Sequence, residues 1–580
     1  MIKTLSKAQK MEREKFCIPR SVQDAIPIRR IFADGIFQVG NRYSKTWSFT
    51  DINYAIAGKE DKTSMFLDYS ELLNALDSGA SAKITIYNRR INKAEFERSV
   101  LLPDKDDGLD EYRHEFNQML TAQVTGTSNS IVRERYLTVS VVKRNADEAR
   151  SYFARVGTDL VTHLAQLSSV AQELTLTERL HIFRDFFKAG EQAAAEFNIH
   201  EHAKRGLHFK DWFCPDSMEF AADHFKIDAR YGRVLYLQDY ASYIKDSFVS
   251  ELCDLDRDLM LSIDILPVPT DEAARQLQST LLGVETNVAN WQRRQNANNN
   301  FTATIPYDME LQRKETKEML DDLTTRDQRM MFGLVTLVHL ADNKEQLDSD
   351  TETLYSTARK HLCQLSTLRW QQKDGLDTVL PYGLRKIQAL RTLTTESTAV
   401  LIPFRAQEIM EPNGLYYGQN AVSKNMIVAD RRLLLNGNSF RLGVSGSGKS
   451  MSAKEEIVQI ALSTEDDILI LDPESEFGYL TEALGGEVIR ISATSDTHIN
   501  ALDMDRAYGD ERNPIVSKSE FVLSLFEQLI GDGMVTAKEK SILGRCTEQV
   551  YLPYIRNGYK GTPPTLQDFY RLLQMQPEPE

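Results

Sequence analysis

The chain has 580 residues, with 69 lysines and arginines against 84 aspartates and glutamates, so its formal net charge is −15. Its composition, 42% hydrophobic and 26% charged, is that of a globular protein and excludes a disordered, collagen-like or disulfide-scaffold chain. The acidic balance argues against a general nucleic-acid coat, whose surface is basic. Five scattered cysteines without a CxxC pair indicate a reducing compartment. Neither a signal sequence nor a stretch of about 20 apolar residues occurs, so we expect a cytoplasmic protein without a transmembrane segment.

A charged tail over residues 1–25 precedes a region in which strand and helix patterns alternate. Residues 82–87 and 136–142 have the apolar patterns of strands, and residues 107–123 and 145–166 those of helices. This order predicts an N-terminal α/β domain over residues 26–210, with a ferredoxin-like arrangement.

A second α/β pattern covers residues 211–400 and includes a long helix after Pro269. Apolar residues spaced by four and three form a seam along this helix, and a charged helix over 308–328 follows. The pair predicts a helical hairpin that projects from a sheet. We interpret the seam as internal core, with docking of a partner as the alternative. The seam consists of Leu277, Leu281, Val284, Val288 and Trp291.

The segment 398–404 (TAVLIPF) is predicted to be a boundary strand that leads into a last domain over residues 401–580. No internal sequence repeat is found. In this last domain, residues 443–450 (GVSGSGKS) satisfy the pattern G-x-x-x-x-G-K-[ST] of the phosphate-binding loop. A strand is expected at 439–442 and a helix at 451–462, which is the context that such a loop requires.

The glycines of this loop let backbone N–H groups turn inward and form an anion nest at a helix N-terminus. We therefore expect ATP and Mg²⁺ as cofactors. Lys449 is expected to reach the β- and γ-phosphates, and Ser450 to ligate Mg²⁺. Arg441 is anomalous, because a buried parallel strand normally stays apolar. The residues expected to bind nucleotide are Gly443, Val444, Ser445, Gly446, Ser447, Gly448, Lys449, Ser450 and Met451.

An acidic motif follows one helix later, where residues 467–474 read DILILDPE. Asp472 is the candidate metal ligand, and Glu474 and Glu476 are candidate catalytic carboxylates. The position directly after the loop helix favours the end of the second strand of the sheet. The alternative is the metal-binding strand itself. A further helix at 479–484 and a strand at 487–491 are expected after it.

Several of these segments together carry a resemblance to a known family. GVSGSGKSMSAKEEI, ILDPESEFGYLTEALGGEVIRIS and INALDMD resemble the ATPase domain of VirB/TrbE/CagE-type ATPases, the VirB-four family of type IV secretion and conjugation. The N-terminal segments AIPIRRIFADGIFQVGNRYSKTWSFTDINYAIAG, RYLTVSVV, LSIDILPVPTDEA and LTTESTAVLIPF agree in style, most closely with the subgroup on Gram-positive conjugative elements.

The resemblance implies a RecA-like P-loop ATPase that couples ATP hydrolysis to channel assembly and to export of DNA or protein. It implies a hexameric or dimer-based homo-oligomer at the inner face of the cell membrane, docked onto inner-membrane components of the secretion channel. Contact with DNA is possible but indirect. The family's later Asp-Glu pair, sensor residue and arginine finger have no positions here. We therefore expect 401–580 to be the N-terminal part of such a domain.

Two other function classes remain open from the sequence. One is an FtsK/HerA-like DNA translocase, and the other is a scaffold that binds nucleotide without hydrolysing it. Arg293 and Arg294 beside an Asn-rich run could touch single-stranded DNA, but aromatic residues are sparse there. A group of histidines with Cys214 has the residue types of a zinc site, although its spacing favours a solvated linker. The histidines are His200, His202 and His208.

Overall fold

The computed structural model describes residues 19–90, 100–126, 131–188, 197–241, 243–255, 257–298, 304–411, 413–492, 494–508, 514–531 and 533–578. The chain divides into two compact units, Met1–Ile468 and Leu469–Glu580. The first holds a large sheet and the phosphate-loop segment, and the second is helical.

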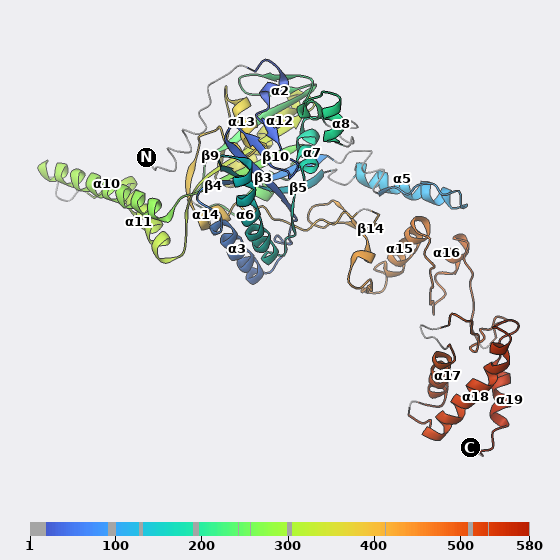
Figure 1. Ribbon diagram of the computed structural model, residues 1–580. Helices are drawn as coiled ribbons and strands as arrows, with labels where there is room; N and C mark the ends of the chain where they lie inside the picture. The colour runs from blue at the N-terminus through green and yellow to red at the C-terminus, as the bar shows by residue number, and fades with distance from the viewer. Residues whose placement is uncertain are drawn as a thin grey trace. The chain divides into compact units, whose positions relative to one another are not determined.

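The first unit is built on a 13-stranded sheet in which every described pair of neighbouring strands is antiparallel (Figure 1). The fold class is therefore mixed α/β, as predicted from the sequence. The strands of the first half are β1 (Arg30–Ile31), β2 (Phe37–Val39), β3 (Arg42–Phe49), β4 (Ala80–Arg90), β5 (Ile131–Val142) and β6 (Ala171–Glu173). Those of the second half are β7 (Met218–Phe220), β8 (Phe225–Ile227), β9 (Arg230–Asp239), β10 (Leu259–Pro267), β11 (Met330–Ala341), β12 (Gln364–Thr367) and β13 (Arg391–Thr394).

The two halves of the sheet have the same β-α-β-β-α-β connectivity. In the first half the spatial order is β6-β3-β5-β4, and in the second it is β12-β9-β11-β10. Each half carries a helical insertion between its second and third strands, α5 in the first and the pair α10–α11 in the second. The helices are α3 (Lys59–Asn74), α5 (Asp110–Gly126), α6 (Ala146–Gln166), α9 (Phe248–Leu252), α10 (Thr270–Ala297), α11 (Tyr307–Thr325) and α12 (Lys344–Lys360).

The two halves meet where β4 pairs antiparallel with β10. At the middle of the β4–β10 pairing Thr85 faces Ser262, and their hydroxyl oxygens lie 2.9 Å apart in a buried hydrogen bond. The segments 26–210 and 211–400, which we distinguished by sequence pattern, thus share one continuous sheet. The repeat in connectivity has no counterpart in a visible sequence repeat.

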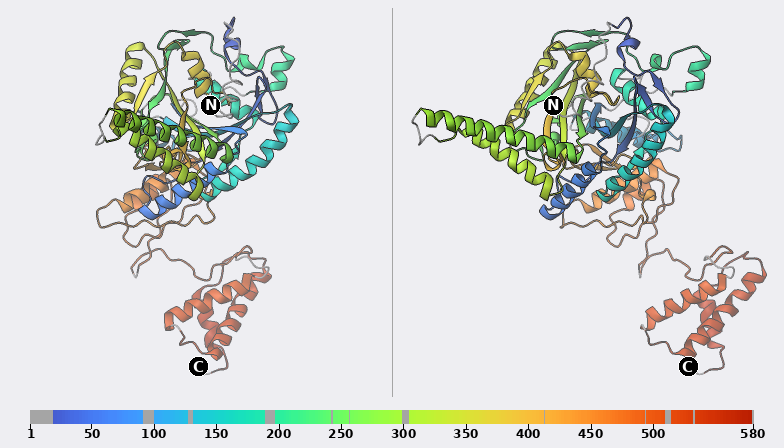
Figure 2. Two further views of the ribbon diagram at one scale, coloured as in Figure 1. Left: turned by 90° about the vertical axis from the view of Figure 1, so that its left-hand side faces the viewer. Right: turned by 60° about the vertical axis from the view of Figure 1, so that its left-hand side comes forward.

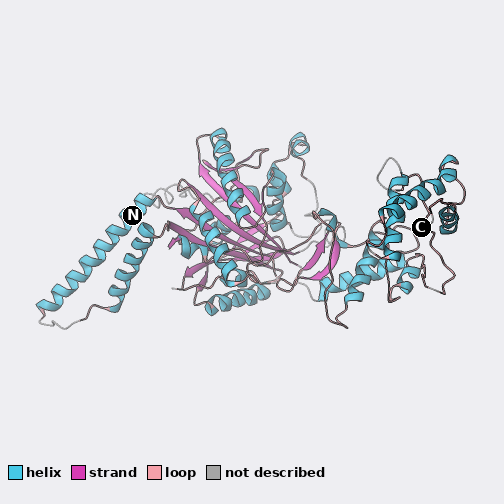
Figure 3. Cartoon of the chain, turned by 90° about the horizontal axis from the view of Figure 1, so that it is seen from below, coloured by secondary structure: helices cyan, strands magenta, loops and turns pink. Residues whose placement is uncertain are grey.

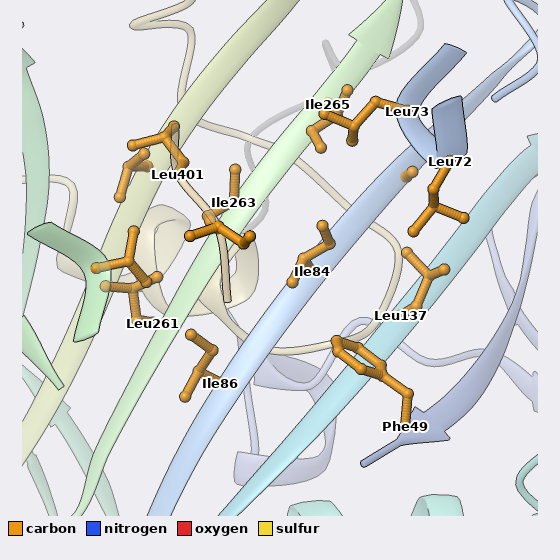
Figure 4. Close-up of a cluster of buried hydrophobic side chains, with 14 of the residues drawn as sticks. Phe49, Leu72, Leu73, Ile84, Ile86, Leu137, Leu261, Ile263, Ile265 and Leu401 are labelled. Atoms are coloured by element: carbon orange, nitrogen blue, oxygen red, sulfur yellow. The ribbon is translucent and has the colours of Figure 1, made fainter. Parts of the chain in front are cut away.

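Helices cover both faces of the sheet, which Figure 3 shows with the strands between them. On one face α3, α6, α9 and α12 bury the side chains shown in Figure 4, among them Ile84, Ile263 and Leu137. The opposite face is covered by α7 (Leu176–Phe187) and α13 (Gln372–Val379). Each fully buried Ile or Leu contributes about 1.5–3 kcal/mol. Because both faces are covered, every residue of β10 and β11 is buried.

Most of the expected elements of this unit are confirmed. The strands 82–87 and 136–142 lie in β4 and β5, and the helices 107–123 and 145–166 correspond to α5 and α6. The expected strand at 398–404 is wrong. Thr394 accepts the backbone N–H of Ser397 at 3.2 Å and starts the helix α14 (Thr395–Ala399), and the following apolar residues enter the core without strand pairing.

The helical hairpin is confirmed, and Figure 2 shows α10 and α11 side by side, extending from the sheet. The seam residues Leu277, Val284 and Val288 are buried, so the interpretation of the seam as internal core is confirmed for them. Glu285 of α10 accepts a hydrogen bond from Arg313 Nε of α11 at 2.8 Å. At the base of the hairpin an apolar cluster joins both helices to β10 and β11.

The second unit packs α17 (Pro514–Ile530), α18 (Ala537–Arg556) and α19 (Leu566–Gln574) around one apolar core, and α16 (Gly478–Ala483) precedes them in the chain. The expected helix at 479–484 is confirmed. The core includes Val522, Leu543, Cys546, Tyr551 and Phe569. Within the parts of both units that the structure describes, no helix combines the length and apolarity needed to cross a membrane.

Candidate phosphate-binding site

The segment 443–450 forms a turn that contains two left-handed glycines and leads into a helix. Gly446 and Gly448 have φ values of +79° and +90°, which L-residues with a side chain rarely adopt. At Gly443 an added Cβ would lie 2.3 Å from Ser447 Oγ, so a side chain there would require the Ser447 hydroxyl to move. Gly448 is the N-cap of α15 (Lys449–Ser463), so the loop ends at a helix N-terminus as predicted. The positive end of that helix favours an anion.

Lys449 folds back over the loop that precedes it. Its ammonium donates hydrogen bonds to the carbonyl oxygens of Gly443 at 2.8 Å and Val444 at 3.2 Å. These contacts hold the cation against the loop. Ser450 is the second residue of α15 and is half-buried, whereas residues 443–449 are exposed. The nine residues expected to bind nucleotide thus lie in this loop and the first turn of α15.

The expected strand at 439–442 is not formed. Phe440 and Leu442 are each 91% exposed, and no described residue pairs with this segment as a neighbouring strand. A parallel strand is stable only when strands on its sides satisfy its N–H and C=O groups. The same correction applies to 467–472 and 487–491, which are not strands and expose Leu469, Leu471 and Ile491.

The acidic candidates lie in a turn. Asp472 accepts the backbone N–H of Phe477 at 2.8 Å, and this and other N–H groups of the turn lower the pKa of its carboxyl. Ser475 in the same turn has a positive φ of 57°, and both Glu474 and Glu476 are exposed. All three acidic residues belong to the second unit, so their convergence on the loop stays a prediction.

A buried carboxylate on α15 was not found by sequence reasoning. Glu456 is 6% exposed and pairs with both Arg441 and Arg431. It also accepts a hydrogen bond from the Tyr417 hydroxyl at 2.9 Å. Arg441 was anomalous for the buried strand expected at 439–442. In the structure it forms an ion pair with the helix that follows the loop.

The strands β14 (Leu415–Gln419) and β15 (Met426–Ala429) form a small antiparallel ribbon beside α15. Gln459 of α15 joins the two elements, since it donates to the Tyr416 carbonyl at 2.8 Å and accepts the Tyr416 N–H at 2.7 Å. Asp430 after β15 accepts the backbone N–H of Arg432 at 3.0 Å and caps the 3-10 turn Arg431–Leu433. The ribbon thus contacts the face of α15 that carries Gln459.

The C-terminal end of α15 is held by the insertion of the first half-sheet. Arg113 of α5 is fully buried and donates from Nε to the Leu462 carbonyl at 3.0 Å. Lys105, which precedes α5, donates to the Ser463 carbonyl at 3.2 Å. The last carbonyls of a helix lack intrahelical partners and carry partial negative charge, so two cations stabilise this end. The sequence offered no signal for this contact, because about 350 residues separate the partners.

The histidine group does not assemble a metal site in the described part of the chain, where no cluster of three or more His, Cys, Asp or Glu residues could hold an ion. His208 instead accepts the Lys210 N–H at 3.2 Å and caps a 3-10 turn. Burial raises the pKa of the Cys214 thiol to about 12. The side chain of His200 lies outside the described residues.

No protein-family model matches the chain, and no curated protein matches it.

Proposed function

We propose that the chain binds ATP with Mg²⁺ at residues 443–451. The observation that carries this proposal is the pair of left-handed glycines that lead directly into α15, with the Lys449 ammonium folded over the loop. Backbone N–H groups at a helix N-terminus together with one lysine suit a polyphosphate chain. Ser450 would supply the hydroxyl ligand to Mg²⁺.

We further propose that the chain is a motor ATPase of the VirB/TrbE/CagE type, with ferredoxin-like half-sheets and the first part of a RecA-like domain. The β-α-β-β-α-β connectivity of each half supports the ferredoxin-like assignment. In this proposal Asp472 assists metal binding and Glu474 and Glu476 polarise the attacking water. The motor would form a homo-oligomer on inner-membrane components of a type IV secretion channel.

Nucleotide titration of the wild type and of Lys449→Ala tests the binding proposal. A charge-assisted hydrogen bond contributes about 1.5–3 kcal/mol, so the variant should bind ATP roughly 10- to 150-fold more weakly. Lys454→Ala is the matched control, because it removes a cation from the same helix farther from the loop. Equal affinities of wild type and Lys449→Ala would refute nucleotide binding at this loop.

A further inference from the structure

The ion cluster around Glu456 joins segments on both sides of the phosphate loop. Arg441 immediately precedes the loop, and Arg431 lies in the 3-10 turn farther upstream. Arg431 also donates to Ser439 Oγ at 2.7 Å. Glu456, on the helix that leaves the loop, therefore pairs with both arginines.

Glu456 itself does not line the loop. It lies about two turns into α15, roughly 10 Å along the helix axis from Lys449. The incoming segment 439–442 has no strand partner among the described residues, so its position relative to α15 depends on side-chain contacts. The Arg441–Glu456 pair links that segment to the helix directly. Because Glu456 is buried, water screens this pair less than it would an exposed one.

We propose that Glu456 is a positioning residue for the phosphate loop. By holding Arg441 on one side and Arg431 on the other, its carboxylate fixes the spacing between the chain that enters the loop and the helix that leaves it. The conformation of the loop, and with it affinity for a nucleoside triphosphate, depends on the charge of this side chain. This inference rests on the proposed nucleotide binding and adds a residue that acts on that site without touching the ligand.

The test measures ATP affinity of the full chain in a set of variants. Glu456→Gln keeps the shape and the hydrogen bond from Tyr417 but removes the charge. Gln459→Ala is the matched control, because Gln459 is on the same buried face of α15 and contacts β14 rather than the loop. Arg441→Gln removes the partner at a residue whose side chain is 33% exposed, so it is a second variant if Glu456→Gln fails to fold.

We expect Glu456→Gln and Arg441→Gln each to weaken ATP binding by about five- to 50-fold, and the double variant to be no weaker than the worse single variant. That non-additivity shows that both variants act by removing the same ion pair, and Gln459→Ala separates this effect from a general loss of packing on α15. Wild-type affinity in both single variants would overturn the inference while leaving the proposed function intact. An equal loss of ATP affinity in Gln459→Ala would also overturn the inference, since the loss would then come from disturbed packing of α15 in general. No ATP binding by the wild type would overturn the proposed function and the inference together.

Discussion

The contact between α5 and α15 gives a sharp prediction for Arg113→Met. Methionine retains most of the apolar stem but removes the donors to Leu462 and to two aspartates. Arg113 donates to the Leu462 carbonyl at 3.0 Å, to Asp107 Oδ1 at 2.6 Å and to Asp110 Oδ1 at 2.5 Å. The carbonyl at the end of α15 then loses its cationic donor in a site where the side chain was fully buried.

The loss should act locally on α15. Hydrogen bonds to charged groups contribute about 1.5–3 kcal/mol each, and the two partly exposed aspartates regain water, so we count only the contact with Leu462 and its burial, about 2–3 kcal/mol. This corresponds to roughly 30- to 150-fold more frequent opening of the helix. The central sheet, which is held by its own two-sided core, should not respond.

Hydrogen exchange followed by mass spectrometry measures this directly, comparing peptides over residues 449–464 with peptides over 259–267. Exchange of the first should accelerate in Arg113→Met and that of the second should stay unchanged. Arg150→Met is the matched control, since Arg150 also pairs with two aspartates but is 46% exposed. Unchanged exchange in α15, or equal acceleration in both regions, would refute the reasoning that α5 holds this helix.

Two further predictions concern the sheet. Arg135→Met leaves the buried Asp51 carboxylate without its cation, so it should lower the free energy of unfolding, measured by urea titration, by about 3–5 kcal/mol. The double variant Arg135→Met/Asp51→Asn should lose less. An equal or larger loss in the double variant would contradict the pairing. Burial disfavours the charged form of Glu251, but hydrogen bonds from Lys360, His361 and Ser247 outweigh it and hold its pKa at about 2. The ionised Glu251 should therefore stabilise the fold above pH 4.5, and this contribution should decline as the pH falls towards 2. The difference in thermal midpoint between wild type and Glu251→Gln should shrink over that range. A constant difference would refute this pH dependence.

The two half-sheets repeat one topology without a visible sequence repeat. In both halves the second and third strands are adjacent and antiparallel, and each half places its helical insertion between them. The two insertions make different contacts. Helix α5 contacts α15, whereas α10 and α11 pack mainly on each other. The order and pairing of the strands repeat between the halves, whereas the sequence shows no visible repeat.

The sequence by itself determined those elements whose conformation depends on residues close together in the chain. The alternation in β4, the seam of α10 and the glycine spacing at 443–450 each specify a conformation within a few residues. It did not determine strands at 439–442 or 467–472, because a strand forms only where a neighbour satisfies its backbone. Only the tertiary structure placed β4 beside β10, Arg113 at the end of α15 and Arg441 on Glu456. These contacts join residues from 15 to 349 positions apart, and their pairing depends on the folded path of the chain rather than on any pattern of spacing.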